Sequence, residues 1–172
     1  MSFPHSAEPI PPPSKDNSKR WQFFAKQLIH DVITGRLYIA RFTFIETPLF
    51  SVKLHRIFRP DHDQELHDHP WSFLSILLWG SYTESYTEKS ATLGVRFYRD
   101  VPWFNFKRAE DLHRIVRIRP CWPARSVVSL VFCGPRRRAW GFVESCGRWT
   151  HYSEFLERRA NPNLRNGRHH GE

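Results

Sequence analysis

The sequence that decides the fold is residues 65–84, ELHDHPWSFLSILLWGSYTE. One residue separates His67 from His69, and the side chains of an extended strand alternate between its two faces. The two imidazoles therefore point the same way, as two ligands of one metal ion must, while Asp68 points to the opposite face. The mainly apolar run 73–79 predicts a strand, Gly80 predicts a turn, and the residues after it predict a returning strand.

A third histidine, His113, begins a second strand-like stretch, HRIVRI. Three imidazoles that converge on a β scaffold are typical of a metal site with open coordination positions. The sequence therefore predicts a metal site made of His67, His69 and His113. The alternatives are a solvated loop pair at 67 and 69, and a hydrogen-bonded core histidine at 113.

The spacing of these residues resembles the first signature of the cupin superfamily, a His-x-His pair followed after ten residues by a glycine, here Gly80. His113 resembles the single histidine of the second signature. The resemblance is closest to small single-domain cupins of bacterial and phage type, and it extends to LHDHPW at 66–71, GPR at 134–136 and WGF at 140–142. It covers residues 36–157 and implies a jelly-roll β-barrel that holds one metal ion.

The chain departs from the cupin pattern at the usual fourth ligand. A glutamate ordinarily stands three or four residues after the second histidine, where this chain has Phe73 and Leu74. The resemblance is therefore to three-histidine cupins, such as thiol dioxygenases and diketone-cleaving dioxygenases. It implies one divalent transition metal, Fe(II) in the first place, and Zn, Mn, Ni and Cu stay open because imidazole suits them all.

Residues of the returning strand are candidates for the rest of the site. Glu84 is a candidate fourth ligand, and its alternative is an exposed strand carboxylate. Alternation puts Tyr82 and Tyr86 on the same face as Glu84, where they either line a substrate pocket or pack in the core. Phe73 is expected to form the pocket wall.

Arginines on the expected strands are candidates for binding an anionic substrate. Arg56 and Arg117 lie near the histidine segments, and alternation puts Arg117 on the face of His113. A guanidinium there would hold a carboxylate or phosphate with two hydrogen bonds. The alternative for each is an exposed arginine. No residue is assigned a catalytic role from the sequence.

The composition limits the possible partners. The chain has 172 residues, a net charge of +9 and 15% aromatic residues, which suits a single domain with a small β-barrel. A basic surface attracts nucleic acid, anionic lipid or an acidic substrate. Because the arginines are scattered and no binding motif is present, we expect no sequence-specific nucleic-acid binding. Weak, salt-sensitive association through the Arg136–Arg138 turn and the basic tail is expected instead.

The location is predicted from what the sequence lacks. The longest apolar run is too short to cross a bilayer, so no membrane partner is expected. The N-terminus has no apolar signal core, and the three cysteines are odd in number without C-x-x-C spacing. We therefore expect a cytoplasmic protein with reduced thiols, and a homodimer stays open.

The predicted organisation is all-β: a single-domain jelly-roll barrel with a helix at each end. Residues 1–18 are expected to be a disordered, proline-rich tail, and 19–35 an amphipathic helix that packs on the barrel and ends at Gly35. The barrel spans 36–157, with a short closing helix over 152–159, and 158–172 form a basic, flexible tail.

The predicted function is that of a mononuclear metal enzyme, of the Fe(II) dioxygenase type, acting on a small anionic molecule. One alternative is a non-catalytic cupin that binds or senses a small ligand. Another is a zinc-dependent isomerase or hydrolase.

Overall fold

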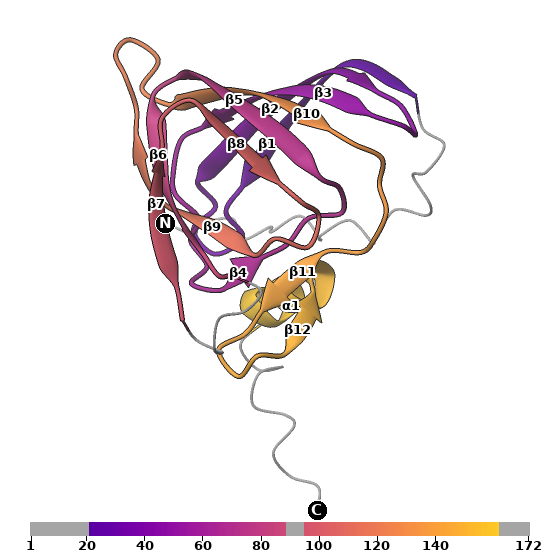
Figure 1. Ribbon diagram of the computed structural model, residues 1–172, viewed down its shortest axis with the longest axis vertical. Coiled ribbons are helices and arrows are strands. Elements are labelled where there is room, and N and C mark those ends of the chain that lie inside the picture. The colour runs from indigo at the N-terminus through magenta and orange to yellow at the C-terminus, as the bar shows by residue number, and fades with distance from the viewer. Residues whose placement is uncertain (1–20, 89–94, 162–172) are drawn as a thin grey trace, which may run out of the picture.

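Two antiparallel sheets form the body of the computed structural model, which describes residues 21–88 and 95–161 (Figure 1). Sheet A has the strand order β1-β2-β3-β10-β5-β8, and sheet B has the order β12-β11-β4-β9-β6-β7. In chain order the elements are β1 (Gln22–His30), β2 (Leu37–Glu46), β3 (Ser51–Ile57), β4 (Leu66–His67), β5 (Phe73–Trp79), β6 (Ser81–Tyr86), β7 (Phe97–Val101), β8 (Phe104–Lys107), β9 (His113–Arg119), β10 (Val127–Cys133), β11 (Gly141–Val143), β12 (Trp149–His151) and α1 (Tyr152–Ala160).

The connections follow the jelly-roll pattern. From β3 to β11 every connection crosses between the sheets except the β6–β7 hairpin. Gly80 makes the crossing from β5 to β6 with φ +74°, and a Cβ there would lie 2.7 Å from the carbonyl oxygen of Arg119. A side chain at this position would therefore clash with backbone. The predicted all-β jelly-roll barrel is confirmed.

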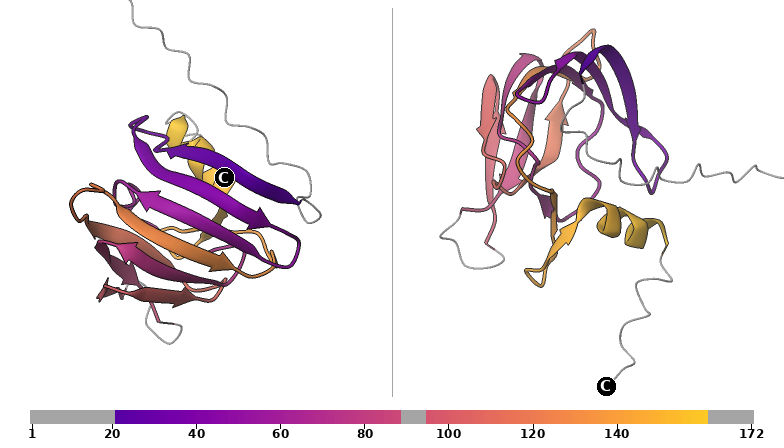
Figure 2. Two further views of the ribbon diagram at one scale, coloured as in Figure 1. Left: turned by 90° about the horizontal axis from the view of Figure 1, so that it is seen from above. Right: turned by 90° about the vertical axis from the view of Figure 1, so that its right-hand side faces the viewer.

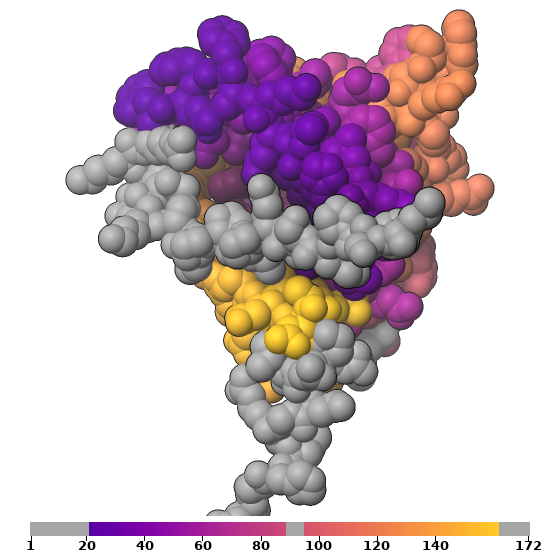
Figure 3. Space-filling model, turned by 180° about the vertical axis from the view of Figure 1, so that it is seen from behind, coloured from indigo at the N-terminus to yellow at the C-terminus, as the bar shows by residue number. Residues whose placement is uncertain are grey.

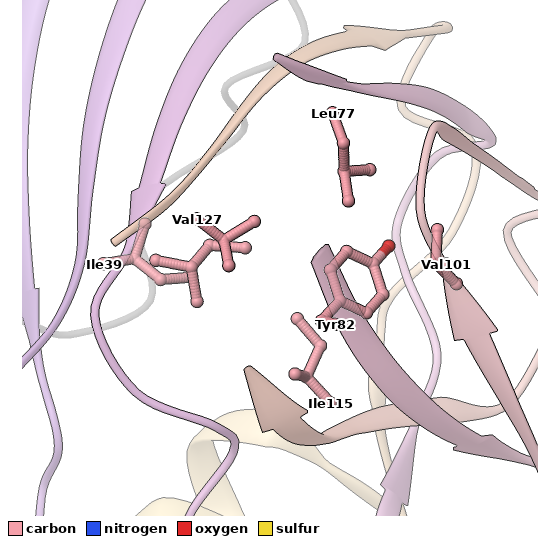
Figure 4. Close-up of a cluster of buried hydrophobic side chains, with 7 residues drawn as sticks. Ile39, Leu77, Tyr82, Val101, Ile115 and Val127 are labelled. Carbon is pink, nitrogen blue, oxygen red and sulfur yellow. The ribbon is translucent and has the colours of Figure 1, made fainter. Parts of the chain in front are cut away.

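Apolar side chains fill only one part of the space between the sheets. Figure 4 shows them pointing toward one another from both sheets. The cluster is Ile39, Ile57, Leu77, Tyr82, Val101, Ile115 and Val127. Each position alternates with outward residues along its strand, as period-two packing requires. This cluster holds the two sheets together.

The rest of the inner face of sheet A is polar. One row of register partners crosses the sheet as Thr43, Lys53, Val131, Ser75 and Asn105. Four of these five are polar and all are buried. Burying polar groups is costly unless they are hydrogen-bonded or ion-paired. The barrel interior therefore has an apolar part that stabilises the fold and a polar part whose groups need hydrogen-bond or ion-pair partners.

The predicted N-terminal helix is wrong, because β1 occupies Gln22–His30 as a strand paired antiparallel to β2. The Asp31 carboxylate accepts hydrogen bonds from the backbone N–H groups of Ile33 and Thr34, at 3.1 and 2.6 Å. Gly35 then takes φ +64°, so these residues form a hairpin turn where the sequence suggested the end of a helix. β1 is an edge strand at the surface of the molecule (Figure 3).

The predicted short C-terminal helix is confirmed, and a hairpin of β11 and β12 precedes it. β11 pairs with β12, and α1 packs through Phe155, whose ring stacks on Phe142 at 4.0 Å between centroids. The helix reaches Ala160, so the expected flexible tail does not begin at 158. The expected tail at 1–18 and residues 162–172 lie outside the described residues. Within the described part of the chain, no helix has the length and apolarity needed to cross a membrane.

Candidate metal centre

The three predicted histidines come together inside the barrel. β4 pairs with β9 through His67 and His113, which are register partners. His69 follows β4, and its backbone N–H donates to the carbonyl of Ala109 at 2.9 Å. Strand pairing thus brings a residue 46 positions away in sequence next to the His-x-His pair.

The geometry of the cluster fits one metal ion. The ring centroids lie 5.0 to 5.1 Å apart, and one ligand atom from each ring lies within 4.8 Å of the others. The Nε2 atoms of His69 and His113 are 2.8 Å apart. Two nitrogens each about 2.1 Å from one metal ion lie roughly 3 Å apart. The cluster can therefore hold one divalent ion with three imidazole ligands.

Burial keeps the imidazoles of His67 and His69 neutral. It lowers the pKa of His67 to about 4, although the carboxylate of Asp61 acts in the opposite direction. Burial also lowers the pKa of His69 to well below its ordinary value, and the nearby His113 and His67 add to the effect. A neutral imidazole has a free lone pair on one nitrogen, which is the form that binds a metal.

Glu84 contacts His113 on the side of the ring that faces away from the other two histidines. Its Oε2 is 2.9 Å from Nδ1 of His113, while Nε2 of the same ring points into the cluster. A carboxylate in this position accepts the Nδ1–H bond and fixes which ring nitrogen carries the proton. The structure thus places Glu84 as the residue that orients His113, and not among the three residues that share the cluster.

Cationic and amide groups surround the Glu84 carboxylate, which is fully buried. Lys107 Nζ lies 2.9 Å from Oε1, Arg99 Nε donates to the same oxygen at 2.6 Å, and Asn105 donates to Oε2 at 2.8 Å. Burial alone would raise the pKa of Glu84, but the hydrogen bond from His113 and the charge and hydrogen bond of Lys107 outweigh it and lower the pKa far below its ordinary value. Glu84 is therefore ionised.

Asp68 faces away from the cluster, as alternation predicts. Its carboxylate accepts from the backbone N–H of Gly141 at 2.7 Å and from the indole of Trp149 at 2.9 Å, and it pairs with Arg138 at 2.8 Å. Asp68 is 2% exposed, so these three partners replace water completely. It fixes the histidine segment to the C-terminal hairpin, and Arg138 is accordingly not a free cation of the 136–138 turn.

The predicted pocket residues of β5 and β6 divide into three cases. Phe73 lies against the cluster, with its ring 4.8 Å from His69, as expected of a pocket wall. Tyr82 belongs to the apolar core, where its hydroxyl accepts from Asn105. Tyr86 lies beneath the cations of Arg99 and Lys107 and lines a separate pocket of about 370 Å³.

The two predicted substrate arginines do not reach the cluster. Arg56 donates to Ser126 and to the carbonyl of Ala124 on the outside of the barrel. Arg117 is exposed, because β9 contains a bulge: Glu84 pairs with Ile115, whereas the adjacent Thr83 pairs with Arg117. The extra residue reverses the alternation after Ile115, so Ile118 faces the core and Arg117 faces solvent.

Other polar residues line the interior that the sequence did not single out. Arg41 donates through Nε to Nε2 of His55 at 3.1 Å, and it is among the charges that lower the pKa of His69. Lys53 is 3% exposed and lies 3.0 Å from Glu46. Alternation along β3 could have predicted that Lys53 and His55 face the interior, because Ser51, Lys53 and His55 share the face of the core residue Ile57.

The geometry can be compared with known proteins. The structure is similar to Fe(II) HppE, at 12% identity over 70% of this chain and 62% of that one, with a TM-score of 0.47. It is also similar to hydroxypropylphosphonic acid epoxidase from S. wedmorenis, at 10% identity over 63% of this chain and 55% of that one, with a TM-score of 0.44. Bacillus subtilis oxalate decarboxylase, in a structure described for its Mn(II) centres, matches at 14% identity over 72% of this chain and 33% of that one, with a TM-score of 0.47.

The chain spans less than two thirds of the length of each of these proteins. No protein-family model matches the sequence, and no curated protein matches it. The described chain itself has a two-sheet jelly roll with three histidines converging inside it. It therefore has the fold and the histidine cluster that the cupin resemblance implies.

Proposed function

We propose that the protein is a mononuclear metal-dependent enzyme, of the Fe(II) dioxygenase type, that acts on a small anionic molecule. The observation that carries this proposal is the cluster of His67, His69 and His113, whose nitrogens lie within 4.8 Å of one another in a buried, polar interior. A three-histidine Fe(II) ion supplies coordination positions for substrate and O₂. The same donors also suit Zn, Mn, Ni or Cu.

The choice of an anionic molecule rests on charge. Neutral imidazoles do not offset the charge of a divalent ion, and the nearest carboxylate behind them, Glu84, is already paired with Lys107 and Arg99. Arg41 adds a further positive charge to the interior and donates there to neutral acceptors. An interior with this balance favours a negatively charged ligand.

The residues of the chain have separate roles in this proposal. The three histidines hold the ion, and Glu84 keeps the proton of His113 on Nδ1, so that Nε2 is the donor atom. Phe73 covers one side of the cluster and excludes water from it. Water exclusion strengthens each electrostatic interaction inside the site.

The first test is metal content. Purified protein is expected to carry one divalent transition ion per chain, and the double variant His67→Ala, His69→Ala is expected to carry almost none. The matched control is His30→Ala with His62→Ala, which removes two exposed histidines outside the cluster. Equal metal in all three proteins would remove the basis for the proposal.

The second test is turnover. Oxygen consumption by the Fe(II)-loaded protein is measured across a panel of thiols, diketones and keto acids, with the double variant as control. Consumption that depends on the histidines supports the dioxygenase. Tight binding of a panel member without turnover, and without dependence on metal, would instead indicate a non-catalytic binding protein. Turnover that requires zinc and no O₂ would indicate an isomerase or hydrolase.

Nucleic acid is not among the expected partners. The three arginines of the 136–138 turn were the main candidate, and Arg138 is ion-paired with Asp68. Any binding through the remaining charges is expected to weaken steeply between about 50 and 200 mM salt. Tight binding to one DNA or RNA sequence at the higher salt would contradict this expectation.

A further inference from the structure

A second polar space lies between the β1–β2–β3 side of sheet A and the loops at Trp71 and Gly134. This basic pocket has a volume of about 420 Å³ and is lined by Lys26, Arg41, Lys53 and Arg136, among other residues. One carboxylate, that of Glu46, also lines it. The pocket therefore carries a positive excess.

The charges of the basic pocket are not equally available. Lys53 is buried and paired with Glu46 at 3.0 Å, so these two offset each other. Arg41 donates to two neutral acceptors, His55 and Gln27. A guanidinium has five N–H donors, so Arg41 retains donors for another acceptor. Among the described residues, no ion pair forms at Lys26 or Arg136, which are exposed at the pocket rim.

The apolar part of the lining sets a further condition on the ligand. Trp71 lies beneath the Lys53 ammonium, 4.6 Å from its ring centroid, and Pro48 and Phe50 form another part of the wall. A bare inorganic ion would leave these surfaces in contact with water. An organic anion would cover them while its charged group meets the arginine.

We propose that the basic pocket binds the oxyanion group of a small organic molecule, with Arg41 as the principal donor and Arg136 and Lys26 at the rim. The carboxylate or phosphate of the ligand receives the guanidinium hydrogen bonds, and its carbon skeleton lies against Trp71 and Pro48. The inference rests on the proposed function only in identifying this molecule with the substrate of the metal site. It gives that substrate a class, an organic acid or organic phosphate.

Calorimetric titration of the full-length protein tests this proposal, with succinate and inorganic phosphate as probes, before and after metal removal by a chelator. Succinate is expected to bind in both states. Arg41→Gln is expected to weaken it about tenfold or more, as loss of a charged hydrogen bond does, and Arg136→Gln several-fold. Arg117→Gln, an equal charge change outside the pocket, is the control and is expected to have no effect.

Three outcomes would overturn the proposal that this pocket binds an organic anion. They are no succinate binding to the wild type, equal affinities of Arg41→Gln and Arg117→Gln, and binding that disappears when the metal is removed. Arg136 is exposed, so its variant keeps the test valid if Arg41→Gln does not fold. A stronger response to inorganic phosphate than to succinate would contradict the role given to Trp71 and Pro48 in binding a carbon skeleton. Absence of metal from the protein would end the proposed function but leave this titration unchanged, so the two failures are distinguishable.

A different observation concerns the outer face of sheet A, which is apolar along whole rows of register partners. One row runs across five strands as Phe42, Leu54, Leu130, Ile76 and Phe104. The next runs across four as Val52, Phe132, Leu74 and Phe106. Figure 2 shows this sheet from outside, with no described element over it. The usual arrangement of an apolar inner face and a polar outer face is therefore reversed here.

The exposed area of this face is large enough for an interface. Phe104 is 69% exposed, Phe106 57% and Phe132 40%, and the exposed Ile76 is the register partner of Phe104. The exposed Phe24 and Phe44 lie against Phe42 of the same face, on β1 and β2. At about 200 Å² for a fully exposed large side chain, these six residues expose about 600 Å². The half-buried residues of both rows add to this area. A stable interface buries about 800 Å² on each partner, whereas a monomer seldom exposes more than about 600 Å² in one patch.

We propose that the outer face of sheet A is covered by the same face of a second copy of this chain. The full-length protein is expected to sediment as a dimer, and Phe104→Glu and Phe132→Glu are each expected to give monomers. Tyr98→Glu, an exposed aromatic residue on sheet B, is the control that stays dimeric. A monomeric wild type, as when residues 1–20 or another protein cover the face, would overturn the proposal. So would a dimer that persists in both phenylalanine variants.

Discussion

Replacing Glu84 by glutamine separates two roles for this residue, a metal ligand and the partner that orients His113. The structure supports the second, because Oε2 lies 2.9 Å from Nδ1 of His113. Glutamine keeps the size and one acceptor oxygen but removes the charge. Substitutions of such partners of metal-binding histidines reduce metal affinity by about 10- to 100-fold. That loss corresponds to about 1.4 to 2.8 kcal/mol.

The same substitution is expected to reduce stability, because Lys107 is 4% exposed and loses its carboxylate partner. Removing one member of a buried ion pair costs about 3 to 5 kcal/mol. Glutamine still accepts one hydrogen bond, so the lower end of that range is expected. Urea unfolding measures this change. Glu144→Gln is the matched control, since its carboxylate, in the turn of the C-terminal hairpin, pairs with Arg158 of α1.

Cobalt titration followed by visible absorption provides the decisive assay. If Glu84 only orients His113, Glu84→Gln shows the wild-type Co(II) spectrum at a weaker affinity. His113→Ala is expected to change the spectrum itself, because a ligand is lost. The reasoning is refuted if Glu84→Gln binds Co(II) as tightly as the wild type. It is equally refuted if its spectrum changes as that of His113→Ala does, since Glu84 would then be a ligand.

Three further predictions follow from buried groups and backbone geometry. The pKa of His67 is lowered to about 4, whereas an unfolded histidine titrates near about 6.5. Between these values unfolded His67 binds more protons than the folded residue, so His67 alone reduces the stability of the metal-free protein by roughly 3 kcal/mol as pH falls through this window. Urea unfolding after chelation should show this slope, and His67→Gln should make it shallower while the part due to His69 remains. Asp68→Asn is expected to cost about 2 to 4 kcal/mol, since a buried charged partner is lost. The control Asp100→Asn, at an exposed carboxylate paired with Arg119, is expected to leave stability almost unchanged. Equal costs would argue against the role of Asp68. Gly80→Ala is expected to cost about 1 to 3 kcal/mol because its φ is positive and a Cβ would meet backbone; a thermal melt at the wild-type temperature would contradict this.

The histidine cluster could be predicted from the sequence because it depends on short-range rules. Alternation fixes the directions of His67, Asp68 and His69 whatever the rest of the chain does. The third member, His113, needed only the expectation that a later strand pairs nearby. These parts of the site follow from spacing alone.

The wrong predictions concern positions whose structure depends on pairing between strands that are distant in the sequence. The segment 22–30 has apolar residues that fit a helix or a strand, and its pairing with β2 selects the strand. Arg117 was assigned to the wrong face because the bulge in β9 is not visible in its sequence. The position of Glu84 behind His113 depends on the register between β6 and β9, which the turn at Gly80 alone does not fix.

Because Asp68 points to the opposite face from His67 and His69, it links the histidine cluster to the β11–β12 hairpin. The three-residue segment that offers two imidazoles to the metal holds the hairpin of β11 and β12 with its middle carboxylate. Coupling between two binding events is reciprocal, so each one strengthens the other by the same factor. Any event that detaches the hairpin would therefore weaken metal binding, and loss of the metal would loosen the hairpin equally. A segment that supplies no ligand is thus expected to influence the metal affinity of the proposed centre.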